Sequence, residues 1–180
     1  MFKRVEGVFT DLEQNQQFEV ERIRKNTLSN PMASEHKAYY NSIAELTKKV
    51  GVYQNKFNKA NTRVKAYQKN LNYVNAERAS LTKDVYELVT TMNVLEREIG
   101  GSPSKEEIGE KDNVSLFSRL YNARGGWNPN SYGPTELHMK SFNVATELFQ
   151  RLQPKIDAYL EKVDAVGKKL ESAGAPILLD

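Results

Sequence analysis

Two apolar heptad repeats constrain the fold of this chain more than any other feature of its sequence. In the first repeat, alternating steps of three and four residues from Ile43 to Ile99 meet a charged residue only at Arg78. The second repeat runs from Phe142 to Ala173 and meets none. A period of about 3.5 residues lines one side of a helix, and that side is buried only against other helices. The sequence therefore predicts an all-α protein with coiled-coil-like helix packing.

The first repeat allows either one continuous helix over residues 43–99 or two antiparallel helices joined by a turn. A continuous helix would be roughly 85 Å long and would have to dimerise to bury its apolar side. Asn70, Asn72 and Asn75 cluster within the repeat. Asparagine favours turns because its side chain hydrogen-bonds to nearby backbone. We therefore predict an antiparallel helical hairpin over residues 34–99, with its turn at residues 70–75.

The segments before and after the hairpin complete one helical domain. In residues 1–33, the capping-box pattern Thr10-Asp11-Leu12-Glu13 predicts an amphipathic helix over residues 10–28. Residues 100–134 form a linker, a short helix capped by Asp112 or Asn113, and a loop rich in glycine. The expected apolar side of the short helix comprises Val114, Phe117, Leu120 and Tyr121.

Residues 135–180 contain a long C-terminal helix and a tail. This helix is expected to begin at Thr135, to run to Ala173 and to end at Gly174. Pro154 removes one backbone hydrogen bond within it and predicts a kink. A long kinked helix of this kind can pack along the hairpin.

Length and composition exclude several classes of protein. A chain of 180 residues with 39% hydrophobic content suits one domain, and no stretch approaches the roughly 18 uninterrupted apolar residues of a membrane span. We expect no signal peptide, because charge and glycine follow the first residues where an apolar stretch would lie. The absence of cysteine excludes disulfides and cysteine metal sites, and it leaves the compartment open.

Charge is unevenly distributed although the net charge is only +3. Residues 46–76 contain no Asp or Glu, and their basic residues, Lys48, Lys56 and Arg63 among them, alternate with tyrosines. This pattern is typical of a surface that binds nucleic acid or an acidic partner. Residues 77–112 are rich in acid, so in a hairpin the two halves would neutralise each other. We favour this neutralisation over nucleic-acid binding.

Motifs of catalysis and cofactor binding do not stand out. His36 and His138 lack a metal-binding partner pattern, and neither Gly100-Gly101 nor Gly125-Gly126 belongs to a phosphate-binding motif. We therefore expect no catalytic, metal-binding or cofactor-binding residue. Trp127 and Tyr132 are candidates for stacking against a partner, although a tryptophan more often pins such a loop onto the bundle.

A recognisable order of segments follows the hairpin. These segments are the short helix Val114-Ser115-Leu116-Phe117-Ser118-Arg119-Leu120-Tyr121, a loop with Trp127-Asn128 and Gly133-Pro134-Thr135, a helix over residues 142–171 with Phe149 and Pro154, and the ending Ala173-Gly174-Ala175-Pro176. The order resembles the C-terminal helical region of large bacterial BNR-repeat, sortilin-like (VPS10-type) β-propeller proteins, relatives of sialidase-like glycoside hydrolases. The resemblance covers residues 34–176 and is best from Leu116 onward.

Members of that family look like exported proteins whose propeller blades precede the helical region. The blade signature Ser-x-Asp-x-Gly-x-x-Trp does not occur in this sequence. The resemblance therefore implies that any glycosidase-like or peptide-binding activity lies in a propeller outside the sequence. It also implies a periplasmic or extracellular location and no catalytic residue in this chain.

Three functional hypotheses remain at this stage. The first is a non-catalytic helical interaction domain that packs on a β-propeller or another protein subunit. The second is an oligomeric coiled-coil scaffold in which residues 43–99 form one helix and pair between chains. The third is a nucleic-acid binder that uses Lys48, Lys56, Arg63 and their basic neighbours. We expect the first, and the sequence leaves monomer and dimer both open.

Overall fold

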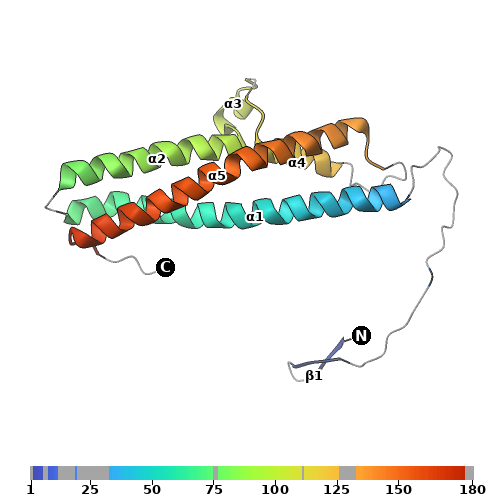
Figure 1. Ribbon diagram of the computed structural model, residues 1–180, viewed down its shortest axis with the longest axis horizontal. Coiled ribbons are helices and arrows are strands. Elements are labelled where there is room, and N and C mark those ends of the chain that lie inside the picture. The colour runs from blue at the N-terminus through green and yellow to red at the C-terminus, as the bar shows by residue number, and fades with distance from the viewer. Residues whose placement is uncertain are drawn as a thin grey trace.

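A computed structural model describes residues 2–5, 8–11, 19, 33–74, 77–110, 112–125 and 133–176. In this part of the chain, three long helices run side by side in an elongated bundle (Figure 1). They are α1 (Ala33–Asn70), α2 (Arg78–Gly100) and α5 (Glu136–Ser172). The shorter elements are β1 (Phe2–Val5), β2 (Val8–Asp11), the 3-10 turn η1 (Leu71–Tyr73), α3 (Pro103–Glu107) and α4 (Leu116–Gly125). The predicted all-α, coiled-coil-like bundle is confirmed.

The helical hairpin is also confirmed, because α1 ends at Asn70 and α2 begins only at Arg78. Glu77, immediately before α2, adopts the left-handed conformation with φ of 56°. Asn70 is buried and donates a hydrogen bond from Nδ2 to the carbonyl oxygen of Pro176 at 3.2 Å. The asparagine that marks the turn in the sequence thus joins the end of α1 to the chain beyond α5. One continuous helix over residues 43–99 is excluded.

The heptad positions form the core. Each is fully buried except Tyr53, Leu71, Phe142 and Ala173, which are partly buried, and Arg78, which is exposed. Phe57 is 1% exposed, and its ring centroid lies 5.4 Å from that of Tyr159 on α5. Each large apolar side chain buried in this way contributes about 1.5–3 kcal/mol. The bundle is therefore stabilised mainly by the two repeats that define it.

A polar layer crosses this core at Asn61 of α1, which is 6% exposed. The Tyr159 hydroxyl of α5 donates to Asn61 Oδ1 at 2.9 Å, and Asn61 Nδ2 donates to Glu96 Oε1 of α2 at 3.1 Å. Burial raises the pKa of Tyr159 well above its ordinary value, so the hydroxyl stays a donor. Since the layer links all three long helices, it fixes their relative register.

Helix α4 differs from its prediction in the residue that caps it and in the side of the helix that is buried. The cap is Ser115, whose Oγ accepts a hydrogen bond from the backbone N–H of Ser118 at 3.2 Å, and not Asp112 or Asn113. Its buried side chains are Leu116, Leu120 and Ala123. Of the expected apolar side only Leu120 is buried, while Val114, Phe117 and Tyr121 are exposed. Two apolar patterns share this helix, and packing against α5 selects the one with Leu116 and Ala123.

The predicted N-terminal helix is wrong at its start, because Thr10 and Asp11 belong to β2. Strands β1 and β2 pair antiparallel, with Phe2 opposite Asp11 and Val5 opposite Val8. Phenylalanine, valine and threonine are residues that favour strands, and this preference outweighs the capping-box pattern. The rest of the expected helix, apart from Glu19, lies outside the described residues.

Helix α5 begins and ends where the sequence predicts. Thr135 caps it, and His138 completes the capping box by accepting a hydrogen bond at Nδ1 from the Thr135 N–H at 3.1 Å. Pro154 lies inside the helix, and Gly174 follows its end with φ of 86°. None of the helices described is both long and apolar enough to cross a membrane.

Tyrosines at helix contacts are expected to make the bundle less stable at alkaline pH. The Tyr39 hydroxyl donates to the carbonyl oxygen of Ala123 at 3.0 Å, and burial raises the pKa of Tyr39 from 10.0 to about 12. The folded state thus favours the neutral phenol, and this contribution is complete below the unfolded pKa and is lost as pH rises through the folded pKa. We expect the free energy of unfolding, measured by urea denaturation, to fall as pH rises from about 10 to about 12. Tyr39→Phe should weaken that dependence, and an equal dependence in both proteins would contradict the assignment.

Candidate protein-interaction surface

A groove of about 590 Å³ lies between α1 and α5 and brings together several of the side chains that the sequence marks for binding. Tyr53 and Phe149 contact each other edge to face within it, with ring centroids 5.5 Å apart. Val52 adds a side chain that is 46% exposed. Lys48 and Lys49 also line the groove and are exposed. Glu45 lines it as well, and Phe149 is only 6% exposed, so Val52 and Tyr53 supply most of the accessible apolar surface.

Tyr53 is held in a fixed position within this groove. Its hydroxyl donates to Asp157 Oδ2 at 3.2 Å and accepts from Gln153 Nε2 at 2.8 Å. Lys56 places its Nζ 5.2 Å from the ring centroid, in a cation–π contact. A half-buried tyrosine with these partners loses little conformational entropy when another molecule contacts it. The groove is therefore preformed.

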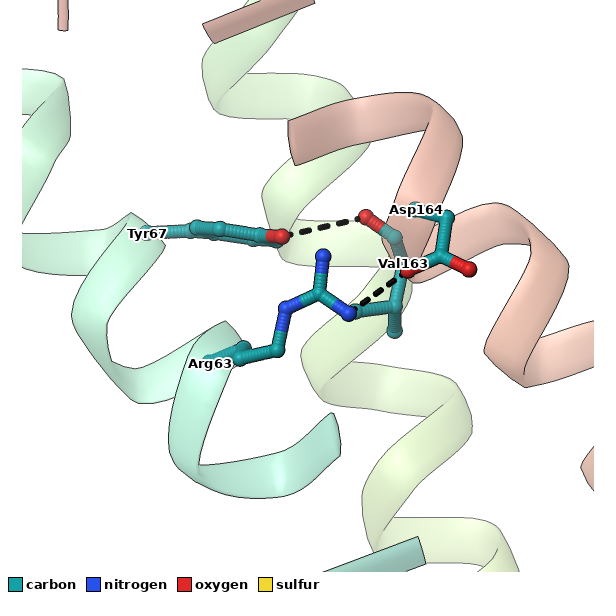
Figure 2. Close-up of polar contacts among 4 residues, drawn as sticks. All are labelled: Arg63, Tyr67, Val163 and Asp164. Carbon is teal, nitrogen blue, oxygen red and sulfur yellow. Dashed lines mark hydrogen bonds and ion pairs between the residues drawn. The ribbon is translucent and has the colours of Figure 1, made fainter. Parts of the chain in front are cut away.

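Arg63, the third predicted basic residue, has a different environment. Figure 2 shows Arg63 and Tyr67 extending from α1 toward Val163 and Asp164 of α5. Arg63 Nη1 lies 2.6 Å from Asp164 Oδ1, and the guanidinium carbon lies 5.9 Å from the centroid of the Tyr67 ring. The Tyr67 hydroxyl donates to the Val163 carbonyl oxygen at 3.3 Å, and burial raises the pKa of Tyr67. Arg63 thus packs α1 against α5, with its charge already paired.

Gly167 of α5 makes room for this packing. A Cβ atom at residue 167 would lie 3.1 Å from Tyr67 Cζ and would overlap the Tyr67 hydroxyl. We therefore expect Gly167→Ala to destabilise the bundle by about 1–2 kcal/mol, measured by urea denaturation, because the ring has to shift. Tyr67→Phe in the same chain should recover part of the loss, since it removes the hydroxyl that overlaps the new methyl group. If Tyr67→Phe recovers no stability in the Gly167→Ala chain, the destabilisation does not come from overlap with the Tyr67 hydroxyl.

The ion pairs that join long helices in the described part of the chain all involve α5. They are Arg63 with Asp164, Lys155 with Glu98 and Lys169 with Asp84. Within these residues no ion pair joins α1 to α2, so the expected neutralisation of the basic helix by the acidic one does not take this form. Two acids of α2, Asp84 and Glu98, pair instead with lysines of α5, because they flank the side of α2 that α5 covers.

Helix α1 consequently keeps an exposed set of lysines. None of these has a carboxylate within 4.0 Å among the residues described, and all lie on the solvent side of the helix or at the rim of the groove. The set comprises Lys48, Lys49, Lys56, Lys59, Lys65 and Lys69. We refer to it as the α1 lysine set. The basic pattern in the sequence therefore corresponds to a basic surface in the structure.

The other candidate residues contribute less to a site. Trp127 and Tyr132 lie outside the described residues. His138 caps α5, and His36 contacts the Tyr40 ring edge to face at 6.4 Å. The groove itself could not be found from sequence, because Phe149 and Gln153 are distant from Tyr53 along the chain. The only advance signal was that tyrosines recur among the lysines.

No group of three or more His, Asp or Glu side chains suited to a metal ion occurs among the residues the structure describes. The groove offers aromatic contact, hydrogen bonding and the charges of two lysines and one glutamate, Lys48, Lys49 and Glu45. Comparisons with protein families, curated proteins and solved structures gave no match to this chain.

Proposed function

We propose that this chain is a non-catalytic helical interaction domain that binds an acidic region of a protein partner along α1. The observation that carries the proposal is the α1 lysine set, which has no carboxylate partner among the described residues and of which Lys48 and Lys49 line the preformed groove beside Tyr53. Positive charge attracts an acidic partner and accelerates its association, while a central aromatic surface supplies most of the affinity of a protein interface. The groove and the lysines together provide both.

An acidic protein fits this surface better than nucleic acid does. Val52 and Tyr53 give the groove an accessible aliphatic and aromatic lining, whereas nucleic-acid binding depends mainly on phosphate contacts. The net charge is only +3, and α2 adds exposed acids such as Glu87 and Glu96. The resemblance to the helical region of sortilin-like proteins makes a β-propeller domain with an acidic surface our first candidate for the partner.

The bundle also favours a monomer over a coiled-coil scaffold. Both heptad repeats are buried within one chain, so neither is left to pair between chains. We expect light scattering after size exclusion to give a mass near the chain mass of 20.5 kDa. A stable dimer would favour the scaffold hypothesis instead.

The proposal can be tested with a fluorescent peptide in which glutamates alternate with leucine and phenylalanine. We expect binding by fluorescence anisotropy that weakens as salt is added, because surface charges are screened. The variant Lys48→Glu/Lys49→Glu/Lys56→Glu should bind at least about tenfold more weakly. The matched control Lys83→Glu/Lys162→Glu/Lys168→Glu changes the net charge equally on exposed positions of α2 and α5 and should bind as the parent chain does.

Two outcomes would contradict the proposal. Equal loss in both variants would mean that net charge alone causes binding. The second outcome is that a duplex DNA of the same length and charge binds more tightly than the peptide does. That result would indicate nucleic acid, and not an acidic protein, as the partner.

A further inference from the structure

A second cleft, of about 770 Å³, lies on the other side of α5 from the groove. Its lining residues come from the end of α2, from α3 and the loop after it, and from the middle of α5. Figure 1 shows where these elements lie. The side chains of α5 that line it are Leu148, Arg151 and Lys155, whereas Phe149 and Gln153 line the groove. The cleft is therefore separate from the surface proposed to bind protein.

Positive charge exceeds negative charge in this cleft. Arg97, Lys105, Arg151 and Lys155 line it, and the only carboxylates among its described lining residues are those of Glu98 and Asp112. Lys155 Nζ lies 2.8 Å from both oxygens of Glu98, and Lys105 Nζ lies 3.9 Å from Asp112 Oδ1. Each carboxylate is thus matched by a lysine.

The two arginines are left over from this pairing. Neither Arg97 nor Arg151 has a carboxylate within 4.0 Å among the described residues, and both are exposed. They come from different helices, α2 and α5, and line the same cleft. Guanidinium groups bind carboxylates and phosphates through paired parallel hydrogen bonds, and they remain charged at any physiological pH. Two of them line this one cleft and give it the chemistry to bind an oxyanion.

The wall of the cleft opposite α5 is held in place by Asp112. Its carboxylate accepts hydrogen bonds from the backbone N–H groups of Ser102 at 2.6 Å and Asn113 at 2.7 Å, which closes the loop that carries α3. Those hydrogen bonds lower the pKa of Asp112, because they stabilise the ionised carboxylate that holds the loop closed. Gly101 permits the sharp turn at the start of this loop, with φ of 89°. The cleft is consequently preformed.

Apolar side chains occupy another part of the lining. Val114 is 45% exposed, and Leu148 packs partly buried against the core. We propose that this cleft binds a small organic oxyanion, a carboxylate or a phosphate ester, whose charge lies between Arg97 and Arg151 and whose apolar part contacts Val114 and Leu148. The apolar contact distinguishes such a ligand from inorganic phosphate.

Calorimetric titration of the full chain with phenyl phosphate, phenylacetate and inorganic phosphate tests this proposal. We expect both aromatic anions to bind more tightly than inorganic phosphate does. Arg97→Gln/Arg151→Gln should weaken their binding by about ten- to a hundredfold, because hydrogen bonds to charged groups are lost. Val114→Ser should weaken binding of phenyl phosphate and leave inorganic phosphate unchanged. Whichever aromatic anion binds more tightly identifies the preferred oxyanion.

Matched controls separate this cleft from the groove. Lys83→Gln/Lys162→Gln removes two positive charges elsewhere and should bind the anions as the parent chain does. Lys48→Glu/Lys49→Glu/Lys56→Glu should also leave anion binding unchanged, so the two proposals can fail independently. Equal weakening in the Lys83/Lys162 control, or no binding of either aromatic anion by the parent chain at millimolar concentration, would overturn the inference.

Discussion

Phe57→Ala is expected to reduce the free energy of unfolding by about 3–5 kcal/mol, the largest effect of any single substitution considered for this chain. Phe57 is 1% exposed and faces the Tyr159 ring at 5.4 Å between centroids. Truncation removes a full aromatic side chain and leaves a cavity at the point where α1 and α5 pack. Because a domain of this size is typically stable by only about 5–15 kcal/mol, the midpoint of thermal unfolding should fall by several degrees or more.

The natural control for this experiment is Tyr86→Ala on α2. Tyr86 is also aromatic but is 71% exposed, so its removal should change stability by less than about 0.5 kcal/mol. Urea denaturation of both variants gives the comparison directly. An unchanged midpoint for Phe57→Ala would mean that the first heptad repeat does not pack as the structure has it.

Asn61→Ala is expected to have the second largest effect, about 2–4 kcal/mol of destabilisation. The substitution removes both hydrogen bonds of the polar layer and leaves the buried Tyr159 hydroxyl without its acceptor at 2.9 Å. A buried polar group that loses its partner costs about 1–3 kcal/mol by itself. The remaining loss comes from packing at a position that is 6% exposed.

A double-mutant cycle with Tyr159→Phe isolates the hydrogen bond from the packing. Since Tyr159→Phe removes the hydroxyl that Asn61→Ala would leave unsatisfied, the double variant should be more stable than the sum of the two single effects predicts. Strict additivity in urea denaturation would show that the Tyr159–Asn61 hydrogen bond contributes nothing. Asn61→Leu is informative as well, because an apolar side chain there would remove the register that the polar layer imposes.

The architecture could be predicted from sequence because long periodic segments determine it. The repeats of residues 43–99 and 142–173 leave little choice about what is buried, and Asn70, Gly100 and Gly174 mark where helices end. The short elements were less accessible. Helix α4 carries two apolar patterns of equal spacing, and only contact with α5 selects Leu116 and Ala123.

For the candidate site, the sequence predicts which residue types are present but not how they are arranged. The basic run in α1 is visible in the sequence, yet whether its charges are free depends on which helix lies beside it. Sequence reasoning assigned the neutralising role to α2, whereas the Arg63 pair is made with Asp164 of α5. The same limit applies to Gly167, an isolated glycine within a helical pattern. Its closeness to Tyr67 is a property of two helices that meet from distant parts of the chain.

The central position of α5 has a consequence for biosynthesis. This helix packs against α1, α2 and α4, and it supplies one member of each ion pair between long helices in the described residues. The ribosome, however, synthesises it after α1, α2 and α4. The nascent hairpin therefore keeps its apolar surfaces uncovered until α5 has left the exit tunnel, so completion of the bundle waits for α5 and the emerging hairpin is exposed to chaperones.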